Sequence, residues 1–192
     1  MSAIHLGGSR SLASPALVAP VVRAILASGQ QIHVGCARGA DQAVIQSALS
    51  IPGGHSSLFV FACFGRGGAQ SAPGAWSGSA VSSVQAAARA GASVSWLAGG
   101  SLAVPLVARL MRRSRAALHG CSASVFFLAS PGSPGSLAVA GHAVKSGQPV
   151  FAFACGFSGP PQAPRGCAGR WVAASFLGFP CWCWSPAQQS MF

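Results

Sequence analysis

A chain of 192 residues, about half of them hydrophobic and only 7% charged, is long enough to bury a core and too apolar to be disordered through polarity. Twelve basic side chains, eleven of them arginine, face a single acidic one, Asp41, so the net charge is +11. This balance favours phosphate-bearing or acidic partners, although a biased base composition would also enrich arginine, glycine and alanine without a functional cause.

Short apolar runs alternate with helix-like segments along most of the chain. We expect strands at 3–8, 31–35, 57–65, 92–100, 123–130 and 149–156. We expect helices at 15–29, 40–50, 79–91, 104–120 and 135–147, and a Gly/Ser/Ala-rich loop that ends near residue 78. Because the strands are continuous apolar runs, they are typical of strands covered on both faces. The alternation predicts an α/β protein with an open, mostly parallel sheet and helices on both faces.

The last part of the chain breaks this alternation. We interpret residues 1–156 as one domain and residues 157–192 as a Pro/Gly-rich linker and an aromatic tail that packs on the edge of the same sheet. The run WVAASF (171–176) is compatible with one more strand. The alternative is that the tryptophans of this region form a docking surface.

Cysteine and histidine spacing gives no sign of a metal site. The seven cysteines include no CxxC pair, and the five histidines show neither HxH nor HxxxH spacing. We expect buried thiols in a reducing compartment, and we expect His5 and His33 to be satisfied core groups. The chain begins without a signal-peptide pattern, and its most apolar region (93–110) is broken by Gly-Gly, Pro and Arg. These features predict a cytoplasmic protein with no membrane partner.

Glycine-rich turns follow four of the predicted strands. They are GGSR (7–10), GCARGAD (35–41), GGS (99–101) and SPGSPGS (130–136). Glycine lets a backbone approach a ligand, and a helix N-terminus offers free N–H groups to an anion. We therefore predict a phosphate-binding site at these strand ends, with the candidate residues Gly8, Ser9, Arg10, Gly35, Arg38, Gly39, Asp41, Gly99, Gly100, Ser101, Gly132, Ser133, Gly135 and Ser136.

Asp41 stands where a helix is predicted to begin. One interpretation is an N-terminal cap or a partner of the helix dipole. The other is a functional carboxylate that accepts hydrogen bonds from ribose hydroxyls or orients Arg38 or Arg10. The two roles are compatible.

The predicted helix 104–120 carries a dense set of arginines. We expect Arg109, Arg112, Arg113 and Arg115 to spread over one broad side of this helix. We expect its apolar contacts to come from Val107, Leu110, Met111 and Leu118. This basic side is either a solvated face or a contact for the phosphates of a nucleotide or a nucleic-acid backbone.

The order of these motifs resembles the SLOG superfamily of Rossmann-like nucleotide binders. The resemblance rests on Gly7-Gly8-Ser9-Arg10, on Gly35-x-Ala37-x-Gly39-Ala40-Asp41, and on the arginine-rich helix followed by the loop PGSPGS (131–136). It covers about residues 3–156 and implies a Rossmann-like fold. The superfamily includes the lonely-guy phosphoribohydrolases and the DNA-processing protein A family.

One departure from that resemblance bears on catalysis. Lonely-guy enzymes carry a catalytic glutamate shortly after a loop similar to 131–136, but here Leu137–Ala140 follow and the chain contains no glutamate. We therefore assign no catalytic residue, no metal and no cofactor.

Three functions follow from the sequence. The first is non-catalytic binding of a nucleotide-derived or phosphate-bearing ligand at the glycine-rich strand ends. The alternatives are binding of single-stranded nucleic acid through the arginine-rich helix, similar to DNA-processing protein A, and a degenerate nucleoside-monophosphate phosphoribohydrolase. A homo-oligomer is compatible with all three.

Overall fold

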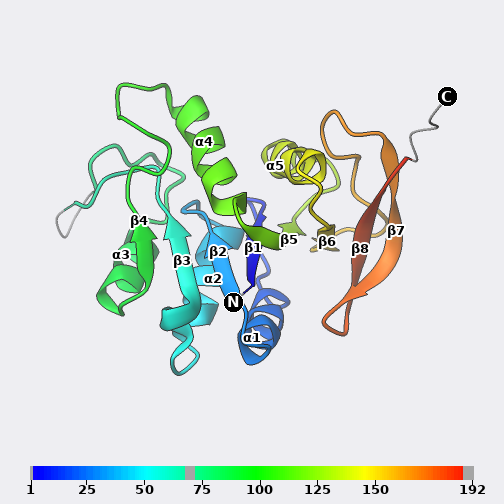
Figure 1. The fold of residues 1–192 in the computed structure, drawn as a ribbon, viewed down its shortest axis with the longest axis horizontal. Helices are drawn as coiled ribbons and strands as arrows, with labels where there is room; N and C mark the ends of the chain where they lie inside the picture. Colours follow the sequence, from blue (N-terminus) through cyan, green and yellow to red (C-terminus); the bar gives the residue numbers. More distant parts are fainter. Residues whose placement is uncertain (1, 68–71, 188–192) are drawn as a thin grey trace.

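The computed structural model describes residues 2–67 and 72–187 (Figure 1). The strands are β1 (Ala3–Gly8), β2 (Gln31–Val34), β3 (Leu58–Phe61), β4 (Ser93–Ser95), β5 (Cys121–Leu128), β6 (Val150–Ala154), β7 (Gly169–Phe176) and β8 (Phe179–Pro186). The helices are α1 (Val18–Ala27), α2 (Ala40–Leu49), α3 (Val81–Arg89), α4 (Leu106–Leu118) and α5 (Pro134–Lys145), with a short 3-10 helix η1 (Gly54–Ser57).

The strands form one sheet in the order β4-β3-β2-β1-β5-β6-β8-β7. The first six strands of the chain pair in parallel, and β8 and β7 continue the sheet in antiparallel fashion. Helices α1, α2 and α3 cover one face, whereas α4 and α5 cover the other (Figure 1). The predicted Rossmann-like α/β fold is therefore confirmed.

Local sequence patterns explain why these elements form. The first five residues of β1 are all buried, as expected for a central strand with helices on both faces. In α1 the fully buried residues Val18, Val21, Val22 and Ile25 follow the helical period, so one side faces the sheet. Pro20 lies in the first turn of α1, where a missing N–H costs no intrahelical hydrogen bond.

Strand β4 is shorter than the predicted strand 92–100. Leu97 has a left-handed φ of 54°, which turns the chain out of the extended conformation soon after Ser95. This turn is hydrogen-bonded to the residue that follows β3, because the N–H of Ala98 donates to the carbonyl of Ala62 at 2.8 Å. The apolar run therefore continues past the strand as a hydrogen-bonded turn. The predicted loop that ends near residue 78 lies partly outside the described residues.

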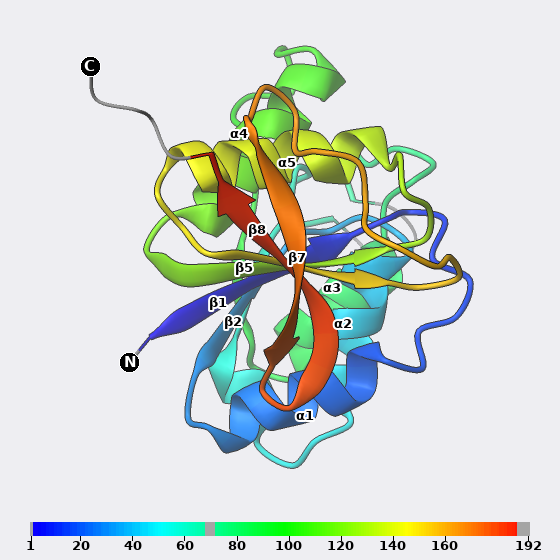
Figure 2. The same cartoon turned by 90° about the vertical axis from the view of Figure 1, so that its right-hand side faces the viewer.

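A β-hairpin takes the place of most of the predicted linker and aromatic tail. Strands β7 and β8 pair along their whole length around the turn Leu177-Gly178, in which both residues have positive φ. Strand β8 pairs with β6 through Phe151 and Cys183, so the hairpin extends the sheet, and it crosses the near end of the molecule in Figure 2. The aromatic segment thus lies at the edge of the sheet, as expected, but residues 179–186 form a strand of that sheet and not an irregular tail. Residues 188–192 lie outside the described part.

Aromatic contacts hold this hairpin. Trp171 of β7 and Trp184 of β8 meet edge to face with ring centroids 5.3 Å apart, and the ring centroids of Phe176 and Phe151 of β6 lie 5.0 Å apart.

No helix in residues 2–67 and 72–187 is long and apolar enough to cross a membrane.

Candidate ligand-binding site

A cavity of about 440 Å³ opens between β1 and β5, at the edge of the sheet where parallel strands end. From β1 the chain adds β2, β3 and β4 on one side, and it then crosses over to add β5 and β6 on the other. The connections on either side of this point leave in opposite directions, which opens a crevice where ligands bind in open α/β sheets. The volume falls in the range of roughly 300 to 1,000 Å³ that is usual for small-molecule pockets.

Ser9 joins the two loops at the cavity mouth. Its Oγ lies 2.6 Å from the Oγ of Ser133 and accepts a hydrogen bond from the N–H of Ala129 at 2.9 Å. Gly8 is needed for this approach, because a Cβ there would collide with the carbonyl oxygen of Phe127. The β1–α1 and β5–α5 loops are therefore fixed to each other, although Ser9 and Ser133 are 124 positions apart in the chain.

The N-terminus of α5 faces this cavity without a side-chain cap. Ser133 occupies the cap position, but its hydroxyl bonds Ser9 and the carbonyl of Ser130 instead. The first helical hydrogen bond runs from Leu137 N–H to Ser133 O, which leaves the N–H groups of Gly135 and Ser136 without a partner among the described residues. Such groups attract an anion.

Arg10 adds a positive charge to the same cavity. Its side chain is exposed, and the residue belongs to the β1–α1 loop and lines the same cavity as Gly135 and Ser136 of the β5–α5 loop. A guanidinium and free helix N–H groups are both good donors to phosphate oxygens. The mouth therefore offers charged and neutral donors from two loops that are joined through Ser9.

Asp41 lies at the floor of the cavity and pairs with Arg113. Arg113 Nη1 is 3.4 Å from Asp41 Oδ2, and the N–H of Ala37 donates to the same oxygen at 3.1 Å. Burial raises the pKa of the Asp41 carboxyl, and the charge of Arg113 opposes that shift. The ion pair that was expected with Arg38 or Arg10 is therefore formed with Arg113 instead. Asp41 lies in the first turn of α2 but is not its cap residue.

Gly35 makes room for this ion pair. A Cβ at this position would coincide with Arg113 Nη1 and would collide with Asp41 Oδ2. Gly35 does not line the cavity. Its small size serves the packing of Arg113 against the end of β2, whereas the sequence suggested close approach of a ligand.

The four arginines of α4 span one broad arc of the helix, as expected, but two of them are buried, so they do not form a single accessible basic face. Arg109 and Arg113 are each 7% exposed and point into the protein, whereas Arg112 and Arg115 are exposed. The reason is that residues four apart share one face of a helix, and here that face is turned toward the sheet.

Arg109 has a structural role in this arrangement. Its Nη1 donates to the carbonyl of Cys63 at 2.8 Å and its Nε donates to the carbonyl of Val104 at 3.0 Å. Arg109 therefore ties the start of α4 to the end of β3. Its donors are directed to backbone groups of the protein, and it does not line the cavity.

Apolar side chains form the inner walls of the cavity. Phe126 of β5, Leu110 and Met111 of α4 and Val139 of α5 line it. Val107 stands at the rim and is 74% exposed, so the expectation that it packs inside is wrong. The cavity therefore combines a polar, cationic mouth with apolar walls and a polar floor that contains His5 and Asp41.

Two cysteines lie beneath α4, beside the ion pair. Cys36 and Cys63 are fully buried, and the N–H of Cys63 donates to the Sγ of Cys36 at 3.3 Å. The hydrogen bond from the Cys36 thiol, together with the charges of Arg113 and Arg109, lowers the pKa of Cys63 to about 7. The same hydrogen bond, together with burial, raises the pKa of Cys36. Sequence reasoning missed this pair because the two residues follow different strands.

His5 lies buried at the floor of the cavity. It was expected to be a core residue with its hydrogen bonds satisfied, and that expectation is wrong for its Nδ1. It is 2% exposed, and its Nδ1 has no hydrogen-bond partner within residues 2–67 and 72–187. Its ring lies 5.5 Å from that of Phe126. Burial, with the positive charge of Arg113, lowers the pKa of His5 to about 3, so its imidazole is neutral near neutral pH.

The depressed pKa of His5 predicts acid sensitivity. Unfolded His5 takes up a proton as the pH falls below 6.5, but the folded protein does not until about 3, so stability present above 6.5 is lost across this interval. Between these pH values, the free energy of unfolding of the His5→Asn variant should fall with decreasing pH less steeply than that of the unchanged protein. We expect the two slopes to differ by about 1.4 kcal/mol per pH unit. Urea unfolding at a series of pH values measures both slopes. Equal slopes would show that His5 is not buried in its neutral form.

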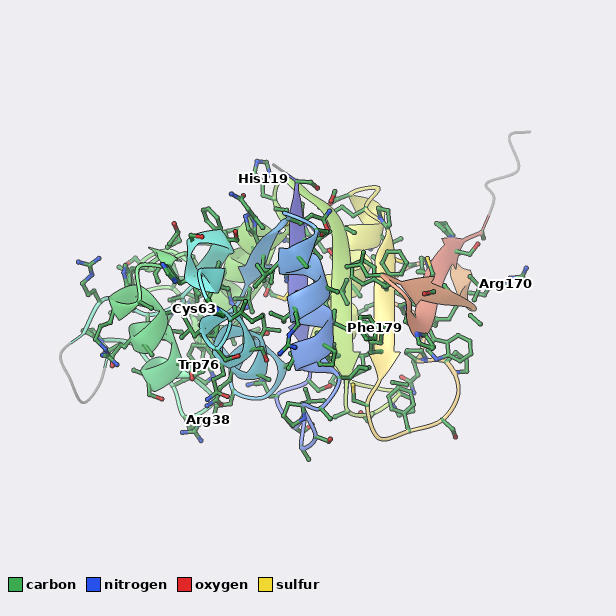
Figure 3. All side chains as sticks on the ribbon, turned by 90° about the horizontal axis from the view of Figure 1, so that it is seen from below. Arg38, Cys63, Trp76, His119, Arg170 and Phe179 are labelled. Atoms are coloured by element: carbon green, nitrogen blue, oxygen red, sulfur yellow. The ribbon has the colours of Figure 1, made fainter. Side chains whose placement is uncertain are left out.

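Six of the predicted ligand-binding residues besides Gly35 do not line the cavity: Arg38, Gly39, Gly99, Gly100, Ser101 and Gly132. Gly39 and Gly99 allow close packing, because a Cβ on either would collide with the backbone of Arg10 or Arg109 respectively. Arg38 is exposed and projects from the lower side of the molecule in Figure 3. The cavity does collect Gly8, Ser9, Arg10, Asp41, Ser133, Gly135 and Ser136.

Trp76 lines the cavity and was missed by sequence reasoning. It lies in the loop before α3, and its Nε1 is buried without a partner in the part of the chain that the structure describes. Its ring contacts Phe64 at a centroid distance of 6.3 Å. An isolated tryptophan in a loop carries no sequence signal that would place it at a strand end.

Comparison of the chain with protein-family models, with curated proteins and with solved structures finds no match. The resemblance to the SLOG superfamily therefore stays a prediction.

Proposed function

We propose that this protein binds a nucleotide-derived, phosphate-bearing ligand in the cavity between β1 and β5 without transforming it. The proposal rests on one observation, which is that the uncapped N-terminus of α5 and the exposed Arg10 line the same cavity. Both groups favour phosphate oxygens. They stand at the strand-order reversal, where ligands of open α/β sheets bind.

The rest of the cavity suits the remainder of such a ligand. A planar ring would contact Phe126, Leu110 and Met111, which line the interior. His5 is neutral there, and a neutral imidazole both donates and accepts a hydrogen bond. A nucleoside has both a flat apolar surface and polar edges.

The interactions of Asp41, the only acidic side chain, argue against hydrolysis of an N-glycosidic bond. Asp41 is buried, accepts the N–H of Ala37 and pairs with Arg113. Cleavage of an N-glycosidic bond by general acid–base catalysis needs a carboxyl group that is free to exchange a proton with the substrate. We therefore expect no release of free base from nucleoside monophosphates, and we rank the degenerate phosphoribohydrolase last.

The orientation of α4 weakens the nucleic-acid alternative. Only Arg112 and Arg115 of its four arginines are exposed. A polynucleotide on this helix would meet two guanidinium groups, not four. The net charge of +11 keeps the alternative worth testing.

Arg10→Ala tests the proposed site against Arg38→Ala, a matched exposed arginine away from the cavity. With AMP, ADP-ribose and a cyclic dinucleotide as calorimetric probes, we expect Arg10→Ala to weaken binding about tenfold through loss of a charge-assisted hydrogen bond. We expect Arg38→Ala to bind as the unchanged protein does. In proton–nitrogen correlation NMR spectra, the amide signals of Gly135 and Ser136 should show the largest chemical-shift changes on binding.

Two results would contradict the proposal. One is that none of the three probes binds the unchanged protein. The other is that they bind but shift amides outside the two loops that Ser9 joins.

An oligonucleotide separates the nucleic-acid alternative from the small-ligand proposal. If the backbone phosphates contact Arg112 and Arg115, changing both to Ala should reduce the log–log salt slope by about 1.4 to 1.8 units. Tight oligonucleotide binding without affinity for any of the three small probes would reverse our ranking.

A further inference from the structure

A second pocket, of about 260 Å³, lies at the opposite edge of the sheet from the cavity described above. It opens between the C-terminal ends of α4 and α5, beside the start of β5, and its walls include Arg115, His119, His142 and Gln148. In Figure 3, His119 lies on the upper side of the molecule and Arg38 on the lower side. His119, His142 and Gln148 belong to no predicted or proposed site, whereas Arg115 is one of the arginines predicted to contact phosphate.

Positive charge gathers at this pocket with no carboxylate to balance it. Arg115 and His119 come from the end of α4, and His142 and the exposed Lys145 come from the last turns of α5. Burial lowers the pKa of His142, and the like charges of Arg115 and Lys145 lower it further. The only acidic side chain, Asp41, is buried against Arg113 at the other edge of the sheet. Within residues 2–67 and 72–187, no acidic side chain therefore neutralises this pocket.

The carbonyl groups that end α4 do not oppose an anion here, because protein donors engage them. His119 N–H donates to the carbonyls of Arg115 and Ala116, and the Gln148 side chain donates to that of Leu118 at 2.8 Å. The ring Nδ1 of His33 lies 3.1 Å from the carbonyl of Ala117. A helix C-terminus normally repels anions through such unpaired carbonyls.

Backbone donors likewise engage the carbonyl groups at the C-terminal end of α5. The N–H of Ser146 donates to the carbonyls of His142 and Ala143, and the N–H of Gly147 donates to that of Val144. The residues that line the pocket from the ends of both helices therefore include the basic Arg115, His119 and His142 and the hydroxyl-bearing Ser146.

Gln148 fixes the two helix ends relative to each other. Its Nε2 donates to the carbonyls of Leu118 and Cys121, and its Oε1 accepts a hydrogen bond from Ser124 at 2.9 Å. The side chain thus bridges α4, β5 and the turn after α5. Because these hydrogen bonds hold the ends of α4 and α5 in place, the hydrogen-bond donors on the two helix ends need little reorganisation to bind a ligand, which limits the entropic cost of binding.

We propose that this pocket binds a phosphate group, free or as part of a phosphomonoester, between Arg115, His119 and His142. One guanidinium, two imidazoles and the Ser146 hydroxyl supply several directional donors, and a tetrahedral oxyanion can accept all of them. The proposal is independent of the ligand in the cavity between β1 and β5.

The pKa of His142 reports occupancy of the pocket. A bound oxyanion opposes the charges of Arg115 and Lys145, so we expect sulfate to raise the pKa of His142 by roughly 0.5 to 1 unit more than chloride at equal ionic strength. Sulfate keeps its charge near neutral pH, which makes the titration clean. By linkage, sulfate should bind more tightly as the pH falls. Histidine-selective NMR of the full chain follows His119 and His142 separately.

Arg115→Ala should remove the sulfate-specific shift of His142. Arg89→Ala is the matched control, because Arg89 is also an exposed arginine in the last turn of a helix. Inorganic phosphate and methyl phosphate, titrated at constant pH, distinguish a free from an esterified source. Either one should perturb His119 and His142.

Three outcomes overturn the proposal. In the first, sulfate shifts the pKa of His142 no more than chloride does. In the second, the shift survives in Arg115→Ala as fully as in Arg89→Ala. In the third, phosphate and methyl phosphate perturb only the amides of Gly135 and Ser136, which would place their binding in the other cavity.

Discussion

Arg113→Ala is expected to lower the free energy of unfolding by about 3 to 5 kcal/mol. The substitution leaves Asp41 buried without its ion-pair partner, and the N–H of Ala37 is then its remaining hydrogen-bond donor among the described residues. For a chain of this length the midpoint of thermal unfolding should fall by roughly 10 °C. Urea unfolding, followed by circular dichroism, measures the change directly.

Two further variants identify the cause. Arg112→Ala on the same helix removes an exposed arginine and should change the free energy of unfolding by less than about 0.5 kcal/mol. The double change Asp41→Asn with Arg113→Met removes both charges, so it should cost less than Arg113→Ala alone. If the single and double variants are equally destabilised, the loss comes from packing and not from an unpaired buried charge.

Gly35→Ala is expected to cost about 3 kcal/mol or more. The added methyl group would occupy the position of Arg113 Nη1 and would also collide with Asp41. It therefore forces the guanidinium away from its carboxylate, and the loss of the ion pair adds to the overpacking. Chemical unfolding of the variant gives the number.

A double-mutant cycle with Arg113 tests this explanation. When Arg113→Ala has already removed the guanidinium, Gly35→Ala should cost much less than it does in the unchanged protein. Gly135→Ala is the control, because a Cβ there meets nothing within 4 Å and Gly135 does not have a positive φ. Additive costs for Gly35→Ala and Arg113→Ala would mean that the methyl group clashes elsewhere.

The strand–helix alternation of residues 3–156 could be predicted because its signals are local. The buried run AIHLGG predicts a central strand, and the spacing of Val18, Val21, Val22 and Ile25 predicts one apolar face of a helix. Parallel strands place all their carboxyl ends at one edge, so the glycine-rich loops were expected there. What the alternation does not contain is the order of the strands in space.

The C-terminal hairpin shows where local signals were misread. The run FPCWCWSP alternates its side chains between the two faces of β8, and Leu177-Gly178 forms the turn that joins it to β7. Its two prolines and its tryptophans suggested a tail. Pairing with β6, a strand that ends at Ala154, decided its conformation, because a strand becomes stable only beside a partner.

The sequence by itself determined the fold class and the chemistry of the loops, because period and turn residues act over a few neighbours. Only the tertiary structure decided that Ser9 meets Ser133 and that Asp41 meets Arg113, 72 positions away. It also decided that Arg109 and Arg113 are buried while Arg112 and Arg115 are exposed. The helical period of α4 only separates those two pairs. Which pair faces inward depends on the sheet, where Gly35 leaves space for a guanidinium and Asp41 offers the only carboxylate.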